Sequence, residues 1–252
     1  MAELSREEQE QREHFNQWQN VYEEHYDDKY SAQLRERFYL EPALRGVDLK
    51  GRRALEAMCG SGQSTGFLLQ RGAEVTGLDL SPAMMGAFSR RWPGSQALTA
   101  SILETGLQEG SFDFVLVVGG LHHVHPYVKD AVREIRRLLK PGGVFAFVEP
   151  HTGSLPDLAR RVWYRLDRSF LPNERAVDVE RLARDFAGDF ELLHVEHHGG
   201  PGYLLVLNSL IFRIPHRFKR FYAPPLIWLD SVLDRVLGKR LSCFVVAQLR
   251  RK

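Results

Sequence analysis

The stretch that decides the fold begins with the apolar run ALEAM at residues 54–58 and continues into the turn Cys59-Gly60-Ser61-Gly62. After one helical segment and a second apolar run it ends at Asp79. Glycines between a strand and a helix let the backbone bend and approach a ligand closely. The N-terminus of the following helix favours negative charge, and an acid ending the neighbouring strand can accept hydrogen bonds from ribose hydroxyls. The stretch therefore predicts a βαβ unit that binds a nucleotide-containing cofactor.

Two cofactors fit this arrangement, a dinucleotide and S-adenosylmethionine. A dinucleotide fingerprint requires Gly-x-Gly-x-x-Gly, whereas the third glycine here, Gly66, comes one residue late. Glu56, just before the turn, has no role beside a pyrophosphate but suits a cationic ammonium or sulfonium group.

Outward from this stretch, short apolar runs alternate with helical segments. Ser81-Pro82 has the pattern of an N-cap and a first helical residue, and a further helix is expected to start at Pro126 and stop at Pro141-Gly142-Gly143. Such alternation predicts a doubly wound α/β fold around a mainly parallel sheet. The expected strands lie at 54–58, 74–78, 97–102, 112–118, 144–148, 190–195 and 243–249.

Four ordered segments of residues 50–150 resemble the class I S-adenosylmethionine-dependent methyltransferases, in particular the group that methylates small molecules. They are LEAMCGSG (55–62), TGLDLSPAMM (76–85), GSFDFVLVVGGLHHV (110–124) and IRRLLKPGGVFAFVEP (135–150). The resemblance implies a Rossmann-like seven-stranded sheet whose last strand is antiparallel. It also implies S-adenosyl-L-methionine as cofactor and S-adenosyl-L-homocysteine as product.

The resemblance also implies contacts to the cofactor. Two positions depart from the family pattern: Met58 stands where the first glycine is common, and Ser101 where an aspartate commonly meets the adenine amino group. A serine hydroxyl can still form a hydrogen bond there. The cofactor-binding residues expected are Glu56, Met58, Gly60, Gly62, Asp79, Leu80, Met84, Ser101, Ile102 and Gly119.

Histidines follow the fourth expected strand, at the sheet edge where ligands of open α/β folds bind. Imidazole titrates near neutrality, so His122 is the first candidate for a general base and His151 the second, while a purely bracing role remains open. His123 is a candidate substrate contact. The histidines lack the cysteine or carboxylate pattern of a zinc site, so no metal is expected.

Residues 1–50 are expected to form a helical cap whose aromatic face includes Tyr22 and Tyr26, either packed on the body or closed over the cofactor and substrate. Residues 51–252 would form the methyltransferase domain. Its segments 151–188 and 199–240, the second a helical insertion, would shape the substrate side.

The charge is uneven: residues 1–50 carry 12 acidic and 7 basic side chains, and residues 213–252 carry 2 and 10. The basic segment 213–252 also contains many apolar residues, which leaves two acceptor classes open. One is a small metabolite under a helical lid; the other is a hydrophobic or lipid-linked acceptor met at a membrane surface. A non-catalytic cofactor-binding protein and an NAD-dependent oxidoreductase are less favoured, and no nucleic-acid-binding module is apparent.

With only two cysteines and no apolar N-terminal or membrane-spanning segment, the sequence predicts a cytoplasmic location. The expected activity is methyl transfer to an oxygen or nitrogen of a small acceptor, by in-line displacement with histidine assistance. Such an enzyme would suit secondary metabolism.

Overall fold

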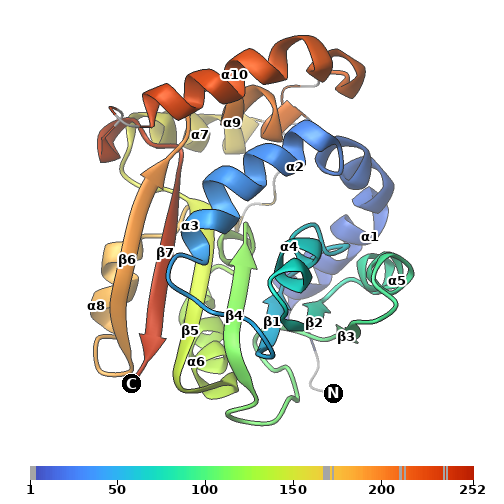
Figure 1. Ribbon diagram of the computed structural model, residues 1–252, viewed down its shortest axis with the longest axis vertical. Coiled ribbons are helices and arrows are strands. Elements are labelled where there is room, and N and C mark those ends of the chain that lie inside the picture. Colours follow the sequence, from blue (N-terminus) through green and yellow to red (C-terminus); the bar gives the residue numbers. More distant parts are fainter. Residues whose placement is uncertain are drawn as a thin grey trace.

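A computed structural model describes residues 4–166, 171, 173–209, 212, 214–234, 236 and 238–252, without the side chains at positions 20, 22, 165, 166 and 216. Its centre is a seven-stranded sheet of order β3-β2-β1-β4-β5-β7-β6 (Figure 1). Strands β1 to β5 are parallel, and β7 runs antiparallel between β5 and β6, which confirms the predicted topology. The strands are β1 (Arg53–Ala57), β2 (Glu74–Asp79), β3 (Gln96–Thr99), β4 (Phe112–Val118), β5 (Leu139–Pro150), β6 (Phe190–His198) and β7 (Phe244–Arg251).

Alternating residues of the central strands supply two apolar cores, one on each face of the sheet. In β4, Val115 and Val117 face one core, and Phe114 and Leu116 face the other. This alternation, with both faces covered by helices, is typical of a doubly wound sheet. The body helices are α4 (Thr65–Gln70), α5 (Pro82–Arg91), α6 (Val128–Leu138) and α8 (Val179–Asp185).

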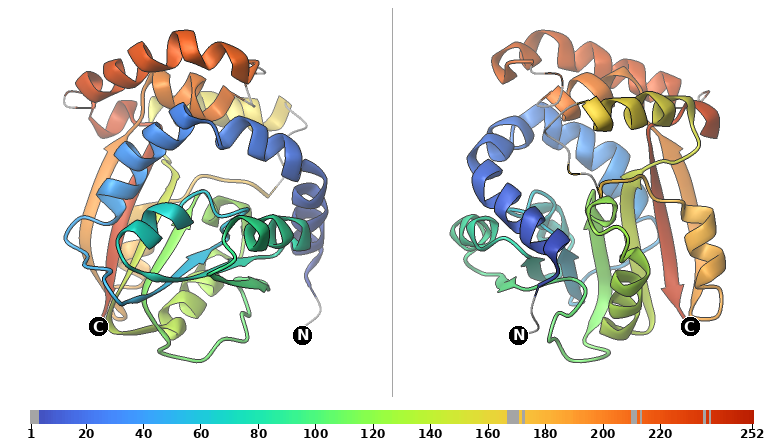
Figure 2. Two further views of the ribbon diagram at one scale, coloured as in Figure 1. Left: turned by 45° about the vertical axis from the view of Figure 1, so that its right-hand side comes forward. Right: turned by 180° about the vertical axis from the view of Figure 1, so that it is seen from behind.

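A second group of helices forms a layer beyond the sheet's C-terminal edge, where the insertion at 199–240 packs against the N-terminal helices (Figures 1 and 2). The N-terminal helices are α1 (Arg6–Tyr26), α2 (Lys29–Arg35), η1 (Glu36–Leu40) and α3 (Glu41–Ala43). The later ones are η2 (Leu121–His123), α7 (Leu155–Leu166), α9 (Pro201–Leu205), η3 (Leu207–Ser209), η4 (His216–Phe218), α10 (Lys219–Leu233) and η5 (Lys239–Leu241).

Three details differ from the sequence-based expectations. α6 begins at Val128, two residues after Pro126, because residues 124–127 form a turn in which the Tyr127 N–H donates to the Val124 carbonyl. β5 starts before the Pro141-Gly142-Gly143 segment instead of after it. Pro224 and Pro225 predict an interruption of the insertion, whereas α10 runs through both.

Among the described residues, none of the helices combines the length and the apolar character needed to cross a bilayer.

Candidate functional site

A cavity opens at the C-terminal ends of β1, β2, β4 and β5, with α1 on one side and α7, α9 and η3 above it. Its volume is about 290 Å³, near the lower end of the roughly 300–1,000 Å³ typical of small-ligand pockets. All ten expected cofactor residues except Gly62 line it, as do His122, His123 and Tyr26. The sheet edge predicted from the strand ends is therefore hollowed where the sequence motifs meet.

The glycine turn is held by the acid that ends β2. Oδ2 of Asp79 accepts a hydrogen bond from the Gly60 N–H at 2.9 Å, and Oδ1 accepts one from the Ser81 N–H at 2.9 Å. Burial raises the pKa of Asp79, and these N–H donors act against that rise. Asp79 thus joins the two loops that approach the ligand and still lines the cavity.

Met58 occupies a left-handed backbone conformation, with φ of +56°. This explains why a glycine is common at the position: a side chain there costs about 1–2 kcal/mol. The thioether of Met58 packs against Gly120. A Cβ at Gly120 would lie 2.8 Å from Sδ of Met58, so this packing requires a glycine at position 120.

Gly62 has a different role from the one expected. It does not line the cavity; its carbonyl accepts a hydrogen bond from Nε1 of Trp92 at 3.0 Å. A Cβ at this residue would lie within 2.7 Å of atoms of Trp92, Phe88 and Thr65, and its φ is +81°. Gly62 therefore allows the turn to pack on α5, behind the ligand-facing surface.

The opposite end of the cavity is lined by Leu80, Met84, Ser101 and Ile102. The hydroxyl of Ser101 is hydrogen-bonded to a carboxylate oxygen of Glu8, which α1 brings to the same cavity wall. The carboxylate missing at position 101 is thus supplied from the N-terminal helix, a contact that the sequence alone did not reveal.

Glu56 and Arg35 lie together on the wall formed by β1 and α2. Glu56 is buried, accepts hydrogen bonds from the Ser64 N–H (3.2 Å) and the Thr65 hydroxyl, and has its pKa raised by burial to about 7. Arg35 is also buried; its guanidinium donates to the Tyr26 carbonyl, at 2.6 Å from Nη2. Within the described chain its Nε is a buried donor without an acceptor. A ligand with an ammonium and a carboxylate group would satisfy both side chains, which is the amino-acid end of S-adenosylmethionine.

His122, on η2, is oriented by a buried glutamate that the sequence analysis did not assign. Oε2 of Glu149, at the end of β5, lies 2.8 Å from Nδ1 of His122. The same carboxylate accepts the N–H groups of Gly120 (2.9 Å) and Leu121 (2.7 Å). Burial, and then the neighbouring His123, lower the pKa of His122, so its ring is neutral near pH 7.

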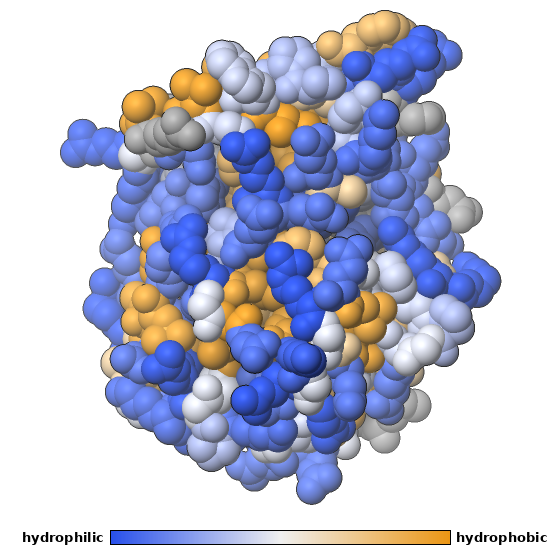
Figure 3. Space-filling view, viewed as in Figure 1, coloured by the Kyte–Doolittle hydropathy of each residue, from blue (hydrophilic) through white to orange (hydrophobic). Residues whose placement is uncertain are grey.

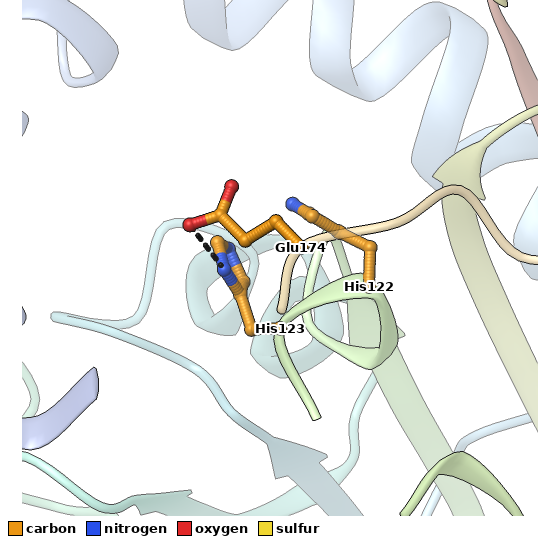
Figure 4. Close-up of side chains that lie close together, drawn as sticks. All are labelled: His122, His123 and Glu174. Atoms are coloured by element: carbon orange, nitrogen blue, oxygen red, sulfur yellow. Dashed lines mark ion pairs between the residues drawn. The ribbon is translucent and has the colours of Figure 1, made fainter. Parts of the chain in front are cut away.

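His123 pairs with a second glutamate, Glu174, whose carboxylate oxygen lies 3.3 Å from Nδ1 (Figure 4). Burial alone would lower the pKa of His123, but Glu174 and the more distant Glu149 outweigh it and raise that pKa. The segment that carries Glu174 is tied to the loop after β4, because Nδ2 of Asn173 donates to the His123 carbonyl at 2.9 Å.

His122, His123 and Glu174 could also hold a metal ion, since one donor atom from each lies within 4.8 Å of the others. The sequence analysis found no carboxylate for such a site because Glu174 is about 50 residues distant in the chain. Direct pairing of His123 with Glu174 opposes metal binding, because a protonated imidazole is not a ligand.

His151, the second candidate base, does not line the cavity. Its ring contacts that of His197 at 4.6 Å between centroids, and burial, with that neighbour's charge, lowers the pKa of His151 to about 4. The structure thus places it behind the cavity wall. His194 and His198 lie on the face of β6 opposite to His197, where both contact Glu196.

Some aromatic residues of the N-terminal helices line the cavity, and others pack in the core. Tyr26 and Trp18 line the cavity, whereas Tyr30 packs in a core cluster. The side chain of Tyr22 lies outside the described residues. Two polar contacts also join α1 to the site: Oδ1 of Asn16 accepts from Ser81 (2.6 Å to Oγ), and Gln11 donates to the His123 carbonyl (3.5 Å).

Comparison with known proteins agrees with this geometry. A family model described as a methyltransferase domain matches residues 55–147. Residues 55–147 are thus a methyltransferase domain, similar to that of the class I S-adenosylmethionine-dependent methyltransferases. The match takes in the glycine turn, Asp79 and the histidine loop after β4.

Two curated relatives match the central part of this methyltransferase. An uncharacterized methyltransferase of Synechocystis is 35% identical over 120 residues, 47% of this chain and 57% of the relative. A malonyl-[acyl-carrier protein] O-methyltransferase of Enterobacter lignolyticus is 36% identical over 115 residues, 46% of this chain and 45% of the relative. The chain thus spans about half the length of the curated relatives it matches.

Among solved structures, the N-methyltransferase NodS of Bradyrhizobium japonicum, in complex with S-adenosyl-L-homocysteine, superposes with a TM-score of 0.58 at 16% identity. The alignment covers 94% of this chain and 98% of NodS. At that identity the likeness concerns the fold.

Proposed function

We propose that this methyltransferase moves the methyl group of S-adenosylmethionine to an oxygen or nitrogen of a small-molecule or lipid-linked acceptor, with His122 as the general base. The observation that carries the proposal is the contact between His122 and Glu149 on the cavity wall. Glu149 also accepts the N–H groups of Gly120 and Leu121, so its oxygens act as acceptors and Nδ1–H of the imidazole donates to it. The lone pair then lies on Nε2, which has no hydrogen-bond partner in the described part of the chain and is available to an acceptor proton.

The cofactor would be held by groups at both ends of the cavity. Arg35 and Glu56 fit its carboxylate and ammonium groups, and Asp79 the ribose. Leu80 and Ile102 would flank the adenine. The bound cofactor supplies a methyl group on a good leaving group, so the protein has to align the acceptor and exclude water. Alignment alone contributes roughly 7–11 kcal/mol to such reactions.

The second histidine supports the first. The raised pKa of His123 favours its protonated form, whose positive charge Glu174 balances and which lowers the proton affinity of its neighbour His122. Protonated His123 also offers a donor to an acceptor with a carboxylate or carbonyl group. The same pairing supports transfer without a metal ion, and dialysis against EDTA is expected to leave the rate unchanged within about 20%, roughly the precision of such assays.

The first test is calorimetric titration with S-adenosylmethionine, S-adenosylhomocysteine and NAD. Saturable binding of the first two ligands is expected, with weaker binding in Asp79→Asn and none of NAD. Asp48→Asn, an exposed aspartate in the loop before β1, is the matched control and should bind as the wild type does. An acceptor screen that measures S-adenosylhomocysteine formation then tests transfer; cofactor binding without turnover on any oxygen or nitrogen acceptor would contradict the proposed reaction.

A further inference from the structure

The outward face of α10 is apolar although it lies on the surface of the molecule. Phe221 and Trp228 are 66% and 67% exposed, and Pro225 and Val232 lie on the same face, at spacings of three and four residues. The opposite face, with Ala223 and Ile227, is buried in the core. Figure 3 shows hydrophobic residues at the left and right of the upper edge, where α10 lies, with paler and hydrophilic residues between them. We call Phe221, Pro225, Trp228 and Val232 the α10 ridge.

The acidic residues near the α10 ridge are buried or paired, whereas the basic residues at its ends are exposed. Asp230 is buried, where it accepts the N–H groups of Gly202 and Tyr203, and Asp234 pairs with His198. The acids of this segment are therefore neutralised or turned inward.

Cations, by contrast, remain at both ends of the ridge. Arg217 and Arg220 are exposed before it and Arg240 after it, and none of the three forms an ion pair within the described ranges. Each of the first two guanidinium groups lies over an adjacent phenylalanine ring, at 5.1 and 4.6 Å from the centroid. An apolar helix face bordered by unpaired cations is the pattern of a helix that lies in a membrane interface.

A second copy of the chain fits this surface poorly. A symmetric contact through the α10 ridge would bring Arg217 and Arg220 of one copy against either the same residues or Arg240 of the other. Both arrangements place like charges together, which disfavours association. An anionic bilayer instead complements the ridge and both of its basic ends.

The helical layer that carries the α10 ridge also covers the cavity. Tyr164 of α7, Tyr203 of α9 and Asn208 of η3 line the cavity from this layer. α7 adds an exposed apolar face of its own, made of Leu155, Leu158 and Val162. α10 thus lies on the outer side of the layer whose inner side lines the cavity (Figure 2).

We infer that α10 docks this methyltransferase on an anionic lipid surface, and that its acceptor carries an apolar anchor resident in the bilayer. Docking itself follows from the surface, whereas the statement about the acceptor rests on the proposed methyl transfer. The basic residues hold the layer at the headgroups while the ridge enters the interface.

The test is flotation of the full chain with vesicles of phosphatidylcholine, with and without 30 mol% phosphatidylglycerol (roughly the anionic fraction that gives polybasic binding). Binding is expected with the anionic lipid and is expected to weaken with added salt. Phe221→Ser with Trp228→Ser should lower the partition coefficient about tenfold or more, because two large exposed side chains lose their burial. Arg217→Gln with Arg220→Gln should lower it roughly fivefold per arginine.

The matched control is Leu69→Ser with Leu192→Ser, two exposed leucines outside this layer, which should bind vesicles as the wild type does. Absence of flotation at low salt, or equal loss in this control, would overturn the inference. So would a wild-type dimer that becomes monomeric in the ridge variant, since the ridge would then be a self-contact. Binding of S-adenosylmethionine is measured by calorimetry on the wild type and on every variant. Absence of binding by the wild type would refute the cofactor site without affecting the conclusion on membrane docking.

Discussion

Glu56 gives the sharpest prediction, because its pKa of about 7 makes cofactor affinity depend on pH. A bound ammonium group favours the ionised carboxylate, so binding lowers this pKa and releases a proton. At pH 6 about nine-tenths of free protein would carry the proton on Glu56, and displacing it weakens binding about tenfold relative to pH 8. Affinity therefore rises as pH increases towards 7 and then levels off.

The assay is isothermal titration of S-adenosylmethionine between pH 5.5 and 7.5, in pairs of buffers that differ in ionisation enthalpy. About 0.9 protons should be released per binding event at pH 6 and about 0.5 at pH 7. S-adenosylhomocysteine retains the ammonium but not the sulfonium, so an equal pH dependence for both ligands assigns the contact to the ammonium.

Two variants separate this effect from other titrating groups. Glu56→Gln should bind with a dissociation constant raised roughly 10- to 150-fold, corresponding to about 1.5–3 kcal/mol for a charge-assisted contact, and with no pH dependence. Glu74→Gln, at an exposed position of β2, should behave as the wild type does. A dissociation constant that is constant from pH 5.5 to 7.5 in the wild type would refute the reasoning.

Three further predictions concern the base, the turn and the helical layer. With an acceptor from the screen, His122→Gln should lower kcat roughly 10²–10⁴-fold. The activity of the wild type should fall as the pH drops through a pKa below 6.5, because only the neutral His122 ring accepts a proton. This acidic fall in the pH–rate profile should be absent from the variant. An unchanged rate would exclude the base role. In urea denaturation, Gly62→Ala should lower the free energy of unfolding by about 1–3 kcal/mol more than Gly110→Ala does. Both glycines have positive φ, but only at Gly62 would a Cβ clash with neighbouring atoms. Equal losses of stability in the two variants would contradict this packing. Lys219→Met should lower the free energy of unfolding by about 1–3 kcal/mol, because the partly buried carboxylate of Asp28 loses its partner. Removal of the exposed pair of Lys239 should cost less than about 1 kcal/mol. Equal losses for the two pairs would contradict a stabilising role of the Lys219 pair.

The sheet order and the acid of the cofactor site could be predicted because their signals are local. Asp79 ends an apolar run and His122 follows another, and parallel strand ends meet at one edge. Arg35 and Glu174 carry no such signal, because they reach the cavity only through the way segments outside the sheet pack over it. Gly62 shows the opposite limit: a motif position was recognised, but its contact with Trp92 depended on tertiary structure.

The buried amine of Lys219 joins the two segments that the sequence analysis treated as separate covers. From the start of α10 it reaches the His25 carbonyl, the carboxylate of Asp28 and the hydroxyl of Ser31, all at the junction of α1 and α2. At its other end α1 meets the cofactor side of the cavity through Glu8. A displacement of α10 must therefore break this charged cluster or move α1 with it. Breaking the cluster costs free energy, because the buried amine of Lys219 would lose its partners. Because α1 also lines the cavity, the surface proposed to face the lipid and the proposed adenine end of the cavity are joined through contacts within one layer of helices.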